Sequence, residues 1–347
     1  MRKISILVLF VGLVWMAGFF MSAGKQAGPW KPTYLSFNIP AGWPKPPKDI
    51  FISNRLTEEG FQLGKKLFYD GRLSKDGNFA CATCHQQYAA FANYDHDFSH
   101  GFNNAFTKRN APPLFNLAWM PLLHWDGAIN HLEVQPLGPI TSTIEMAEQI
   151  DSVLFKLKKD SVYRRMFKAA FGDATINSQR LLKAIAQFTG TIISAGSKYD
   201  KVQRGEASFT PSEQNGYQLY KTKCSGCHPE PLFTDYSFRN NGLSVNKLLN
   251  DSGRMRITRD NKDSLKFKVP SLRNVAISFP YMHDGRFFSL GEVIDHYRTG
   301  IVTAQPSLDS LLKKRIPLTN MEKNNLIFFL HTLTDSTLTH NPRFAVH

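Results

Sequence analysis

Two five-residue stretches decide the fold of this chain: Cys81-Ala82-Thr83-Cys84-His85 and Cys224-Ser225-Gly226-Cys227-His228. They contain all four cysteines of the sequence, and both have the pattern C-x-x-C-H. Two thiols one helical turn apart can add to the two vinyl groups of a haem, and the adjacent histidine then reaches the iron from one face. The sequence therefore predicts a covalently attached c-type haem at each motif.

Three other uses of a C-x-x-C pair explain this sequence less well. Disulfides suit an exported protein, but they leave both histidines without a role. A shared zinc site is disfavoured because the two pairs lie about 140 residues apart, far outside the usual spacing of zinc ligands. A thioredoxin-like redox motif needs a preceding strand, and no strand pattern precedes either copy.

The bulk composition is that of a globular protein with more than one domain. The chain has 347 residues, more than one hydrophobic core usually holds, with a hydrophobic fraction of 42% and a charged fraction of 20%. Its formal net charge of +14 favours an acidic partner or an anionic surface. The basic residues are scattered and form no nucleic-acid-binding motif, so we expect no nucleic-acid partner.

The N-terminus has the features of an export signal. Met1-Arg2-Lys3 precedes an apolar run from Ile4 to Met21, and the small residues Ser22-Ala23-Gly24 follow. We therefore expect residues 1–24 to be a signal peptide or an N-terminal membrane anchor, which places the rest of the chain in the periplasm. Residues 25–50 are rich in proline and lack a helical period, which predicts an extended leader.

The regions around the two motifs resemble each other, which predicts a duplicated domain. A similar helical phrase precedes each motif: Glu59-Gly60-Phe61-Gln62-Leu63 and Asn215-Gly216-Tyr217-Gln218-Leu219. Each domain then ends in an apolar-periodic helix, at 177–193 and at 319–333. Strand patterns are scarce, so we predict a mainly α fold.

Capping signals place the starts of these helices. Thr57 precedes an acidic first turn, Thr210-Pro211-Ser212-Glu213 is a capping box with proline in the first turn, and Thr319 is followed by Glu322 in a second box. A stretch rich in glycine, serine and charge, 194–208, then predicts the boundary between the domains. We assign the domains to residues 51–200 and 201–340.

At this point the chain resembles the bacterial di-haem cytochrome c peroxidase family, including its MauG-type branch. The resemblance runs from about Leu56 to Leu333 and rests on phrases in the same order. Besides the two haem motifs these are Leu63-Gly64-Lys65-Lys66-Leu67-Phe68, Arg109-Asn110-Ala111-Pro112, Trp125-Asp126-Gly127, Gly138-Pro139-Ile140, Glu145-Met146, Pro270-Ser271-Leu272-Arg273-Asn274 and Pro280-Tyr281-Met282-His283-Asp284-Gly285.

The resemblance implies two tandem cytochrome c-like domains, each around one haem, with His85 and His228 as proximal iron ligands. It makes the N-terminal domain peroxidatic and the C-terminal domain an electron-transfer domain. Counted from the Trp-Asp-Gly phrase, Gln135 and Glu145 match the two distal-pocket residues of the family, and Trp125 matches the tryptophan between the haems.

The chemistry of these residue types agrees with their implied roles. Cleavage of a peroxide O–O bond requires a proton to move from the inner to the outer oxygen, which a carboxylate such as Glu145 can do. The neutral amide of Gln135 can hold peroxide by hydrogen bonds without competing for that proton. Trp125 can pass an electron.

Further ligands follow from the resemblance alone. A calcium ion between the domains is implied at Asn110, Ser278 and Pro280. Tyr297 stands fourteen residues after His283, where many members have a methionine ligand to the second haem and the MauG-type branch has tyrosine. We take Tyr297 as that ligand, with Met282 or His296 as alternatives.

The first haem's distal side has two possible alignments. Counting back from Arg109 puts Phe102 at the place of a histidine that blocks this haem in some members, whereas the phrase His100-Gly101-Phe102 puts His100 there. We prefer Phe102, which implies a five-coordinate iron that needs no reductive activation.

We therefore expect a periplasmic enzyme of the cytochrome c peroxidase type. It reduces hydrogen peroxide to water with electrons from a small cytochrome c or cupredoxin, and a homodimer is compatible with this role. A MauG-like oxidase acting on a protein or small molecule is one alternative, favoured by Tyr297. A non-catalytic electron carrier is the other, and Glu145 and Gln135 argue against it.

Overall fold

The computed structural model describes residues 30–346, so the expected signal segment 1–24 lies outside the described residues. The chain divides into two units, residues 1–31 and 32–347, and both C-x-x-C-H motifs lie in the second. None of the helices within 30–346 has the length and apolar character needed to cross a bilayer.

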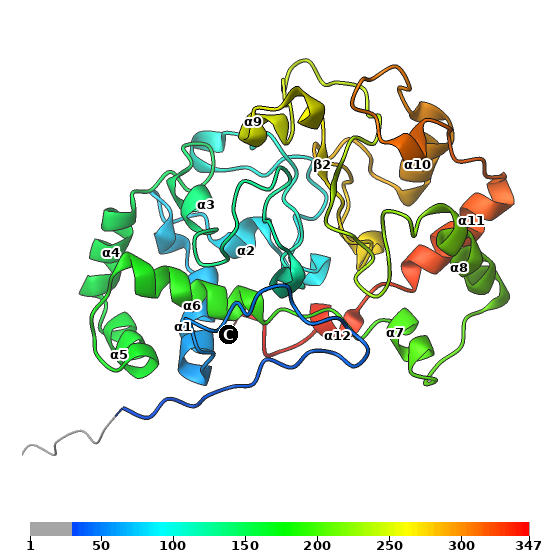
Figure 1. Cartoon of the computed structure of the whole chain (residues 1–347). Coiled ribbons are helices and arrows are strands. Elements are labelled where there is room, and N and C mark those ends of the chain that lie inside the picture. The colour runs from blue at the N-terminus through cyan, green and yellow to red at the C-terminus, as the bar shows by residue number, and fades with distance from the viewer. Residues whose placement is uncertain (1–29, 347) are drawn as a thin grey trace, which may run out of the picture. The chain divides into compact units, whose positions relative to one another are not determined.

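The second unit is mainly helical, as predicted, and its two halves lie side by side in Figure 1. The first half contains α1 (Glu58–Phe68), α2 (Cys81–Cys84), α3 (Leu137–Thr141), α4 (Ile150–Lys159), α5 (Ser161–Phe171) and α6 (Ser178–Gly190). The second contains α7 (Lys198–Gln203), α8 (Pro211–Lys223), α9 (Met255–Thr258), α10 (Leu290–Asp295), a π-helical turn (His296–Gly300), α11 (Asn320–His331) and α12 (Ser336–Thr339). Two short antiparallel strands, β1 (Phe238–Arg239) and β2 (Phe267–Lys268), pair with each other.

A glycine lets two helices cross closely in each half. A Cβ atom on Gly64 of α1 would lie 1.9 Å from the carbonyl oxygen of Ala184 in α6, and one on Gly216 of α8 would lie 1.9 Å from that of Asn325 in α11. Only glycine permits this approach, since a real side chain would overlap the backbone of the facing helix. The same crossing in both halves supports the duplication inferred from the sequence.

The repeat has a different register from the one the sequence phrases suggest. The two phrases that precede the haem motifs align Gly60 with Gly216. In the structure, however, the glycine at the crossing of α1 and α6 is Gly64, one helical turn later, and it is this residue that corresponds to Gly216 at the crossing of α8 and α11. The matching pattern is glycine followed by an aromatic residue four positions on, Phe68 and Tyr220, both fully buried. Gly60 and Gly64 lie one turn apart on the same helix face, so the sequence alone could not choose between them.

The predicted helix starts are confirmed. The side chains of Thr57, Asn177, Thr210 and Thr319 each accept a hydrogen bond from a backbone N–H of the helix that follows, and both predicted capping boxes are formed. These caps fix the ends of the four crossing helices.

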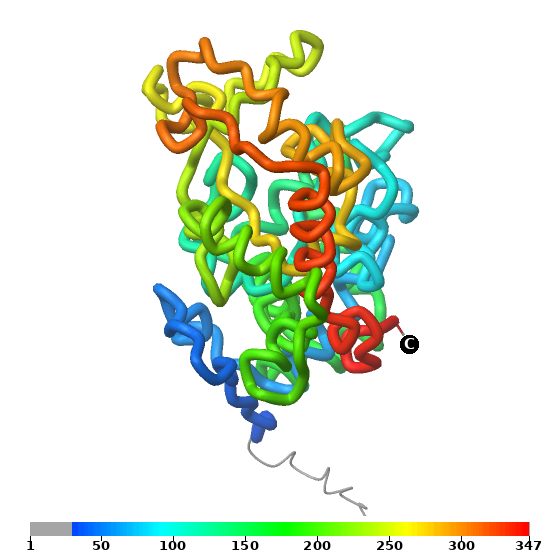
Figure 2. The backbone as a smooth tube through the Cα atoms, turned by 90° about the vertical axis from the view of Figure 1, so that its right-hand side faces the viewer, coloured from blue at the N-terminus to red at the C-terminus, as the bar shows by residue number. Residues whose placement is uncertain are grey.

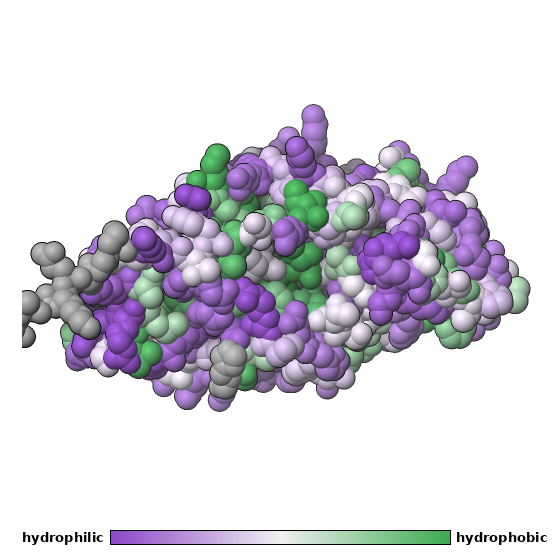
Figure 3. All heavy atoms as spheres, turned by 90° about the horizontal axis from the view of Figure 1, so that it is seen from below, coloured by the Kyte–Doolittle hydropathy of each residue, from purple (hydrophilic) through white to green (hydrophobic). Residues whose placement is uncertain are grey.

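Residues 32–50 of the leader belong to the second unit, have no helix and pack against the rest of that unit. The Trp119 indole Nε1 donates to the Pro44 carbonyl at 2.7 Å, and the Trp43 and Trp119 rings meet edge to face at 5.1 Å. The Arg273 guanidinium lies 4.6 Å from the centre of the Trp43 ring. The leader therefore contacts both halves. Figure 3 shows the molecule from below, mainly hydrophilic with hydrophobic residues gathered near its middle.

The C-terminal segment returns to the first half of the molecule. Tyr69 donates its hydroxyl to the Phe344 carbonyl at 2.8 Å, and Arg343 forms a 2.8 Å ion pair with Glu58 of α1. The Phe344 ring lies 6.0 Å from both Phe61 and Phe188. Figures 1 and 2 show this segment leaving α11 and ending beside the first half. The predicted boundary within 194–208 stays a prediction.

Candidate functional site

The first C-x-x-C-H motif opens onto an apolar cavity. Helix α2 is a single turn, and Cys81, Cys84 and His85 line a cavity of about 610 Å³ together with residues from α1, α6 and the loops. His85 Nδ1 lies 2.9 Å from the Phe91 carbonyl oxygen, which holds the ring. Burial lowers the pKa of His85 to about 4, so its imidazole is neutral, the form that binds iron.

The second motif repeats this arrangement. Cys224, Cys227 and His228 line a cavity of about 1560 Å³, and His228 Nδ1 lies 3.1 Å from the Phe233 carbonyl oxygen. Phe91 and Phe233 are equivalent residues, because both have a left-handed backbone, with φ of 61° and 55°. Each positive φ turns the phenylalanine carbonyl toward the histidine and so fixes the orientation of the ring.

Both cavities fit a covalently bound haem. None of the four cysteines forms a disulfide, and each pair lies on the wall of a mainly apolar cavity, where its thiols can bind haem. Lys268 supplies an independent observation in the second cavity. Its ammonium group is buried and donates to the Leu122 carbonyl at 2.9 Å. Among the described residues it forms no ion pair within 4.0 Å, and Asp126 acts on it only from a greater distance. Burial lowers the pKa of Lys268 to about 7.

Burying a cation of this kind is costly unless an anion lies beside it. Haem carries two carboxylate side chains. The cysteines and histidine of the motif therefore suit its vinyl groups and its iron, and the Lys268 ammonium suits a carboxylate. Sequence reasoning missed Lys268, since a single lysine in a strand gives no signal of its burial.

Glu145 and Gln135 both line the first cavity, as expected for distal residues. Burial raises the pKa of Glu145, and a hydrogen bond from Ser142 opposes part of this rise. The loop that carries Glu145 is held by the Phe102 backbone N–H, which donates to the Glu145 carbonyl at 2.7 Å. A Cβ atom on Gly101 would lie 2.2 Å from the Ile144 carbonyl oxygen, so only glycine fits beside this loop.

The structure brings His100, and not Phe102, to the first cavity. His100 is among the lining residues, where its ring contacts Phe106 at 4.3 Å. Phe102 instead lies under Lys75, with 5.1 Å between the ammonium and the ring centre. The hairpin around Gly101 thus turns residue 100 toward the cavity, and the alignment of Phe102 with the family's histidine stays a prediction.

Trp125 lies on a hairpin that the second half repeats. Its indole Nε1 donates to the Asn110 carbonyl at 2.8 Å, and its own carbonyl accepts from the Lys268 backbone N–H at 2.8 Å. Bridges close the two hairpins at Leu123 with Ile129 and at Tyr281 with Phe287. Trp125 lines the second cavity, at the contact between the two halves.

A cluster of ion pairs fixes the Trp125 loop against the second half. Arg109 binds Asp126 at 2.7 Å and Asp251 at 2.6 Å, and Arg256 lies 3.3 Å from Asp126. Asp126 is fully buried, so the pairs act in a low dielectric. The sequence phrases contain Arg109 and Asp126, but nothing in the sequence indicates Asp251 as their partner.

Tyr297 and Met282 both line the second cavity, whereas His296 does not. Tyr297 lies in the π-helical turn, a feature frequent at functional sites, and burial raises its pKa to about 12. Asn241 donates from Nδ2 to the Met282 sulfur at 3.4 Å, and its carbonyl oxygen lies 3.0 Å from His296 Nε2. His296 therefore has a structural partner in place of a haem.

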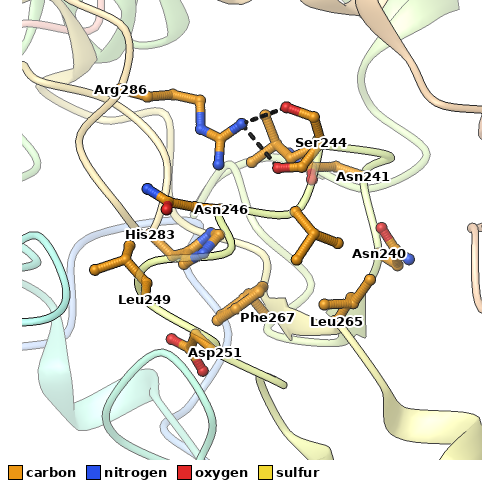
Figure 4. A pocket seen from close by; sticks show the side chains of 12 residues that line it. Asn240, Asn241, Ser244, Asn246, Leu249, Asp251, Leu265, Phe267, His283 and Arg286 are labelled. Atoms are coloured by element: carbon orange, nitrogen blue, oxygen red, sulfur yellow. Dashed lines mark hydrogen bonds between the residues drawn. The ribbon is translucent and has the colours of Figure 1, made fainter.

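A smaller cavity of about 350 Å³ adjoins the second one (Figure 4). The two share Asn241, Leu243, Phe267 and His283, and the His283 ring stacks on Phe267 at 3.7 Å. Arg286 donates to both the carbonyl and the hydroxyl of Ser244 at 2.9 Å, the dashed lines of the figure. The Phe267 and His283 rings thus form part of the wall of both cavities.

The three residues implied for calcium lie on the wall of the second cavity. Asn110, Ser278 and Pro280 are all among its lining residues, and the Asn110 backbone N–H donates to the His283 carbonyl at 2.8 Å. Within 30–346, no three His, Cys, Asp or Glu side chains are grouped as a metal site. Calcium at this place stays a prediction.

Taken together, two C-x-x-C-H motifs on two apolar cavities define a c-type cytochrome with two haem sites. The comparisons with known proteins agree. The family model for di-haem cytochrome c peroxidase matches residues 58–208. The chain is 34% identical over 344 residues to the methylamine utilization protein MauG of Methylophilus methylotrophus, covering 95% of this chain and 97% of that protein.

Peroxidases are similar as well. The cytochrome c551 peroxidase of Nitrosomonas europaea is 33% identical over 239 residues, which cover 67% of this chain and 71% of that protein. A solved MauG-like protein associated with microbial copper homeostasis superimposes with a TM-score of 0.80 at 35% identity, over 90% of this chain and 99% of that one. The chain therefore belongs to the di-haem cytochrome c peroxidase family and is an oxidoreductase of the peroxidase type with two c-type haems.

Proposed function

We propose that the chain reduces hydrogen peroxide to water at its first haem site, in the periplasm, with electrons from a small cytochrome c or cupredoxin. The observation that carries the proposal is the pair Glu145 and Gln135 on the first cavity, which His85 also lines. An electron carrier needs no proton-transferring carboxyl at its haem. The charge of +14 favours an acidic donor protein.

The chain's own residues supply proton transfer and orientation. When bound, the first haem would supply the iron for peroxide and the two electrons that cleave its O–O bond, which the donor protein then replaces. Glu145 would carry a proton from one peroxide oxygen to the other, so that the oxygen that receives it leaves as water. The remaining oxygen leaves as a second water once two protons from solvent and the two donor electrons have been supplied. The raised pKa of Glu145 moves the carboxyl toward the operating pH, where such transfer is most effective. Gln135 orients the peroxide through its amide.

The remaining residue roles belong to the same proposal. Trp125 carries electrons between the two sites, and its place between Asn110 and β2 holds it still. Tyr297 would be a further ligand to the second haem iron, which would favour the oxidised state of that haem. Asn110, Ser278 and Pro280 hold a calcium ion beside the interface, through oxygen ligands.

A MauG-like oxidase is the second candidate. Tyr297 on the second cavity favours it, since methionine at that place is the alternative in the family. The observed similarity to proteins named MauG is compatible with either candidate.

Steady-state turnover separates the candidates. The purified holoprotein is mixed with hydrogen peroxide and a reduced cytochrome c, and oxidation of the cytochrome is followed by absorbance. We expect turnover that Glu145→Gln removes. Glu148→Gln is the matched control, because Glu148 is also buried but binds Lys156 outside the cavity. Absence of turnover in the wild-type protein would exclude the peroxidase proposal.

A further inference from the structure

Three tyrosines gather on the proximal side of the second haem site. Tyr220 of α8 is fully buried, and its hydroxyl donates a short hydrogen bond to the carbonyl oxygen of His228. The Tyr217 ring lies parallel to the Tyr220 ring, 6.2 Å away. Tyr199 of α7 is buried against Tyr217 at 6.2 Å. Figures 1 and 2 show α7, α8 and α11 together at this edge of the molecule.

Two of these phenols donate hydrogen bonds to one carboxylate, that of Glu230. Tyr199 donates to Glu230 Oε1 at 2.6 Å, and Tyr217 donates to the same oxygen at 2.9 Å. Burial and the hydrogen bond to Glu230 raise the pKa of Tyr217 to about 12. Glu230 is exposed and Tyr217 is half-exposed, with the Lys221 ammonium 4.7 Å from its ring centre. The cluster therefore runs from the backbone of the His228 ligand to the surface.

The fold does not need these phenols. In the first half Phe68 occupies the place of Tyr220, and it packs on Phe188 at 5.0 Å much as Tyr220 packs on Phe329 at 5.1 Å. Lys65 occupies the place of Tyr217. Packing around the first haem site is thus achieved without a hydroxyl at either position, so the hydroxyls and the shared carboxylate of the second half require another explanation.

We propose that Tyr217, with Tyr220 and Glu230, forms a proton-coupled redox site through which an external one-electron reductant at the α8 surface delivers electrons to the second haem site. The inference rests on the proposed peroxide reaction, which supplies the oxidant. The Tyr217 phenol gives one electron, by way of Tyr220, to the haem pair oxidised by peroxide, and gives its proton to the Glu230 carboxylate. The reductant then returns one electron to the neutral phenoxyl radical, and Glu230 returns the proton.

The geometry supports each part of this step. The acceptor of the proton is already hydrogen-bonded to the phenol, so the proton moves along an existing contact while the electron leaves in the other direction. Tyr199 remains bonded to the same carboxylate oxygen and holds it in place. The exposed side of Tyr217 gives the reductant access.

Freeze-quench electron paramagnetic resonance tests the proposal. The oxidised holoprotein is mixed with hydrogen peroxide in the absence of a donor, and the haem absorbance is recorded in parallel. We expect a tyrosyl radical whose high-field spectrum reports a hydrogen bond, with loss of that signal in Tyr217→Phe. Glu230→Gln, which removes the proton acceptor and keeps the shape, should also suppress it. Tyr34→Phe is the control, since Tyr34 is an exposed tyrosine under Arg55 outside the cluster.

The outcomes separate the two proposals. A haem spectrum that responds to peroxide together with a radical lost in Tyr217→Phe supports the redox site. A responding spectrum with no tyrosyl radical, or with a radical that persists in Tyr217→Phe and Glu230→Gln, overturns the redox site alone. A haem spectrum that does not respond to peroxide overturns the peroxide reaction, and the redox site with it.

Discussion

Replacing Lys268 by methionine tests whether an anionic cofactor completes the second cavity. Burial lowers the pKa of this lysine from 10.5 to about 7, although the charge of Asp126 opposes part of the shift. At 1.36 kcal/mol for each pKa unit, that depression means a charged, unmatched Lys268 costs the folded protein up to about 5 kcal/mol at low pH. Stability would then rise as the pH increases from about 7 to 10.5, because the unfolded state binds more protons in that window.

The sign of the change therefore depends on the partner. Without an anion, methionine relieves the buried charge and stabilises the protein. If a haem carboxylate is paired with Lys268, the methionine variant leaves that carboxylate buried without a partner, which costs about 3–5 kcal/mol of stability. In that case the wild-type protein should not become more stable as the pH rises above 7.

Urea unfolding of the holoprotein at several pH values, followed at the Soret band, measures both effects. We expect Lys268→Met to be destabilised. Lys223→Met, an exposed lysine on the rim of the same cavity, is the control and should change little. A Lys268→Met holoprotein that is as stable as the wild type, or more stable, would refute the pairing.

Three further predictions concern single residues. The rate of peroxide reduction should fall as the pH drops through the raised pKa of Glu145, because the protonated carboxyl cannot accept the first proton. Glu145→Gln should lower this rate by about 10²–10⁴-fold. In stopped-flow measurements the variant should also lose the fall in rate at low pH. Gly216→Ala should destabilise the holoprotein by about 1–3 kcal/mol or more, because its Cβ would lie 1.9 Å from the Asn325 carbonyl oxygen. Gly291→Ala is the control and should be tolerated, since the nearest neighbour of its Cβ is the flexible Lys323 ammonium at 3.4 Å. Equal urea midpoints for the two variants would contradict this prediction. Tyr297→Phe should change the electron paramagnetic resonance spectrum of the second haem and raise its potential, and an unchanged spectrum would exclude Tyr297 as a ligand.

The sequence predicted best those features that depend on neighbouring residues in the chain. The haem motifs, the caps at Thr210 and Thr319 and the alignment of Gln135 and Glu145 with the first cavity all rest on short spacings. The signals were strong because cap residues and thioether cysteines act within one helical turn.

The features that were missed depend on contacts between distant segments. Arg109 and Asp251 are 142 residues apart, and Lys268 becomes an unmatched buried cation only once the two halves meet. Whether His100 or Phe102 lines the first cavity depends on how one hairpin turns at Gly101. The choice between Gly60 and Gly64 depended on where α6 crosses α1. Neither question has an answer in local propensity.

Intact-mass spectrometry of the denatured holoprotein is the most direct measurement of the two covalent haem sites. Unfolding releases any cofactor that is not covalently bound, so only thioether-linked haem remains. We expect a mass increase of two haems for the wild type, and of one haem for Cys81→Ala/Cys84→Ala and for Cys224→Ala/Cys227→Ala. A wild-type mass with one haem or none, in protein matured with its haem-attachment machinery, would contradict the assignment of both cavities.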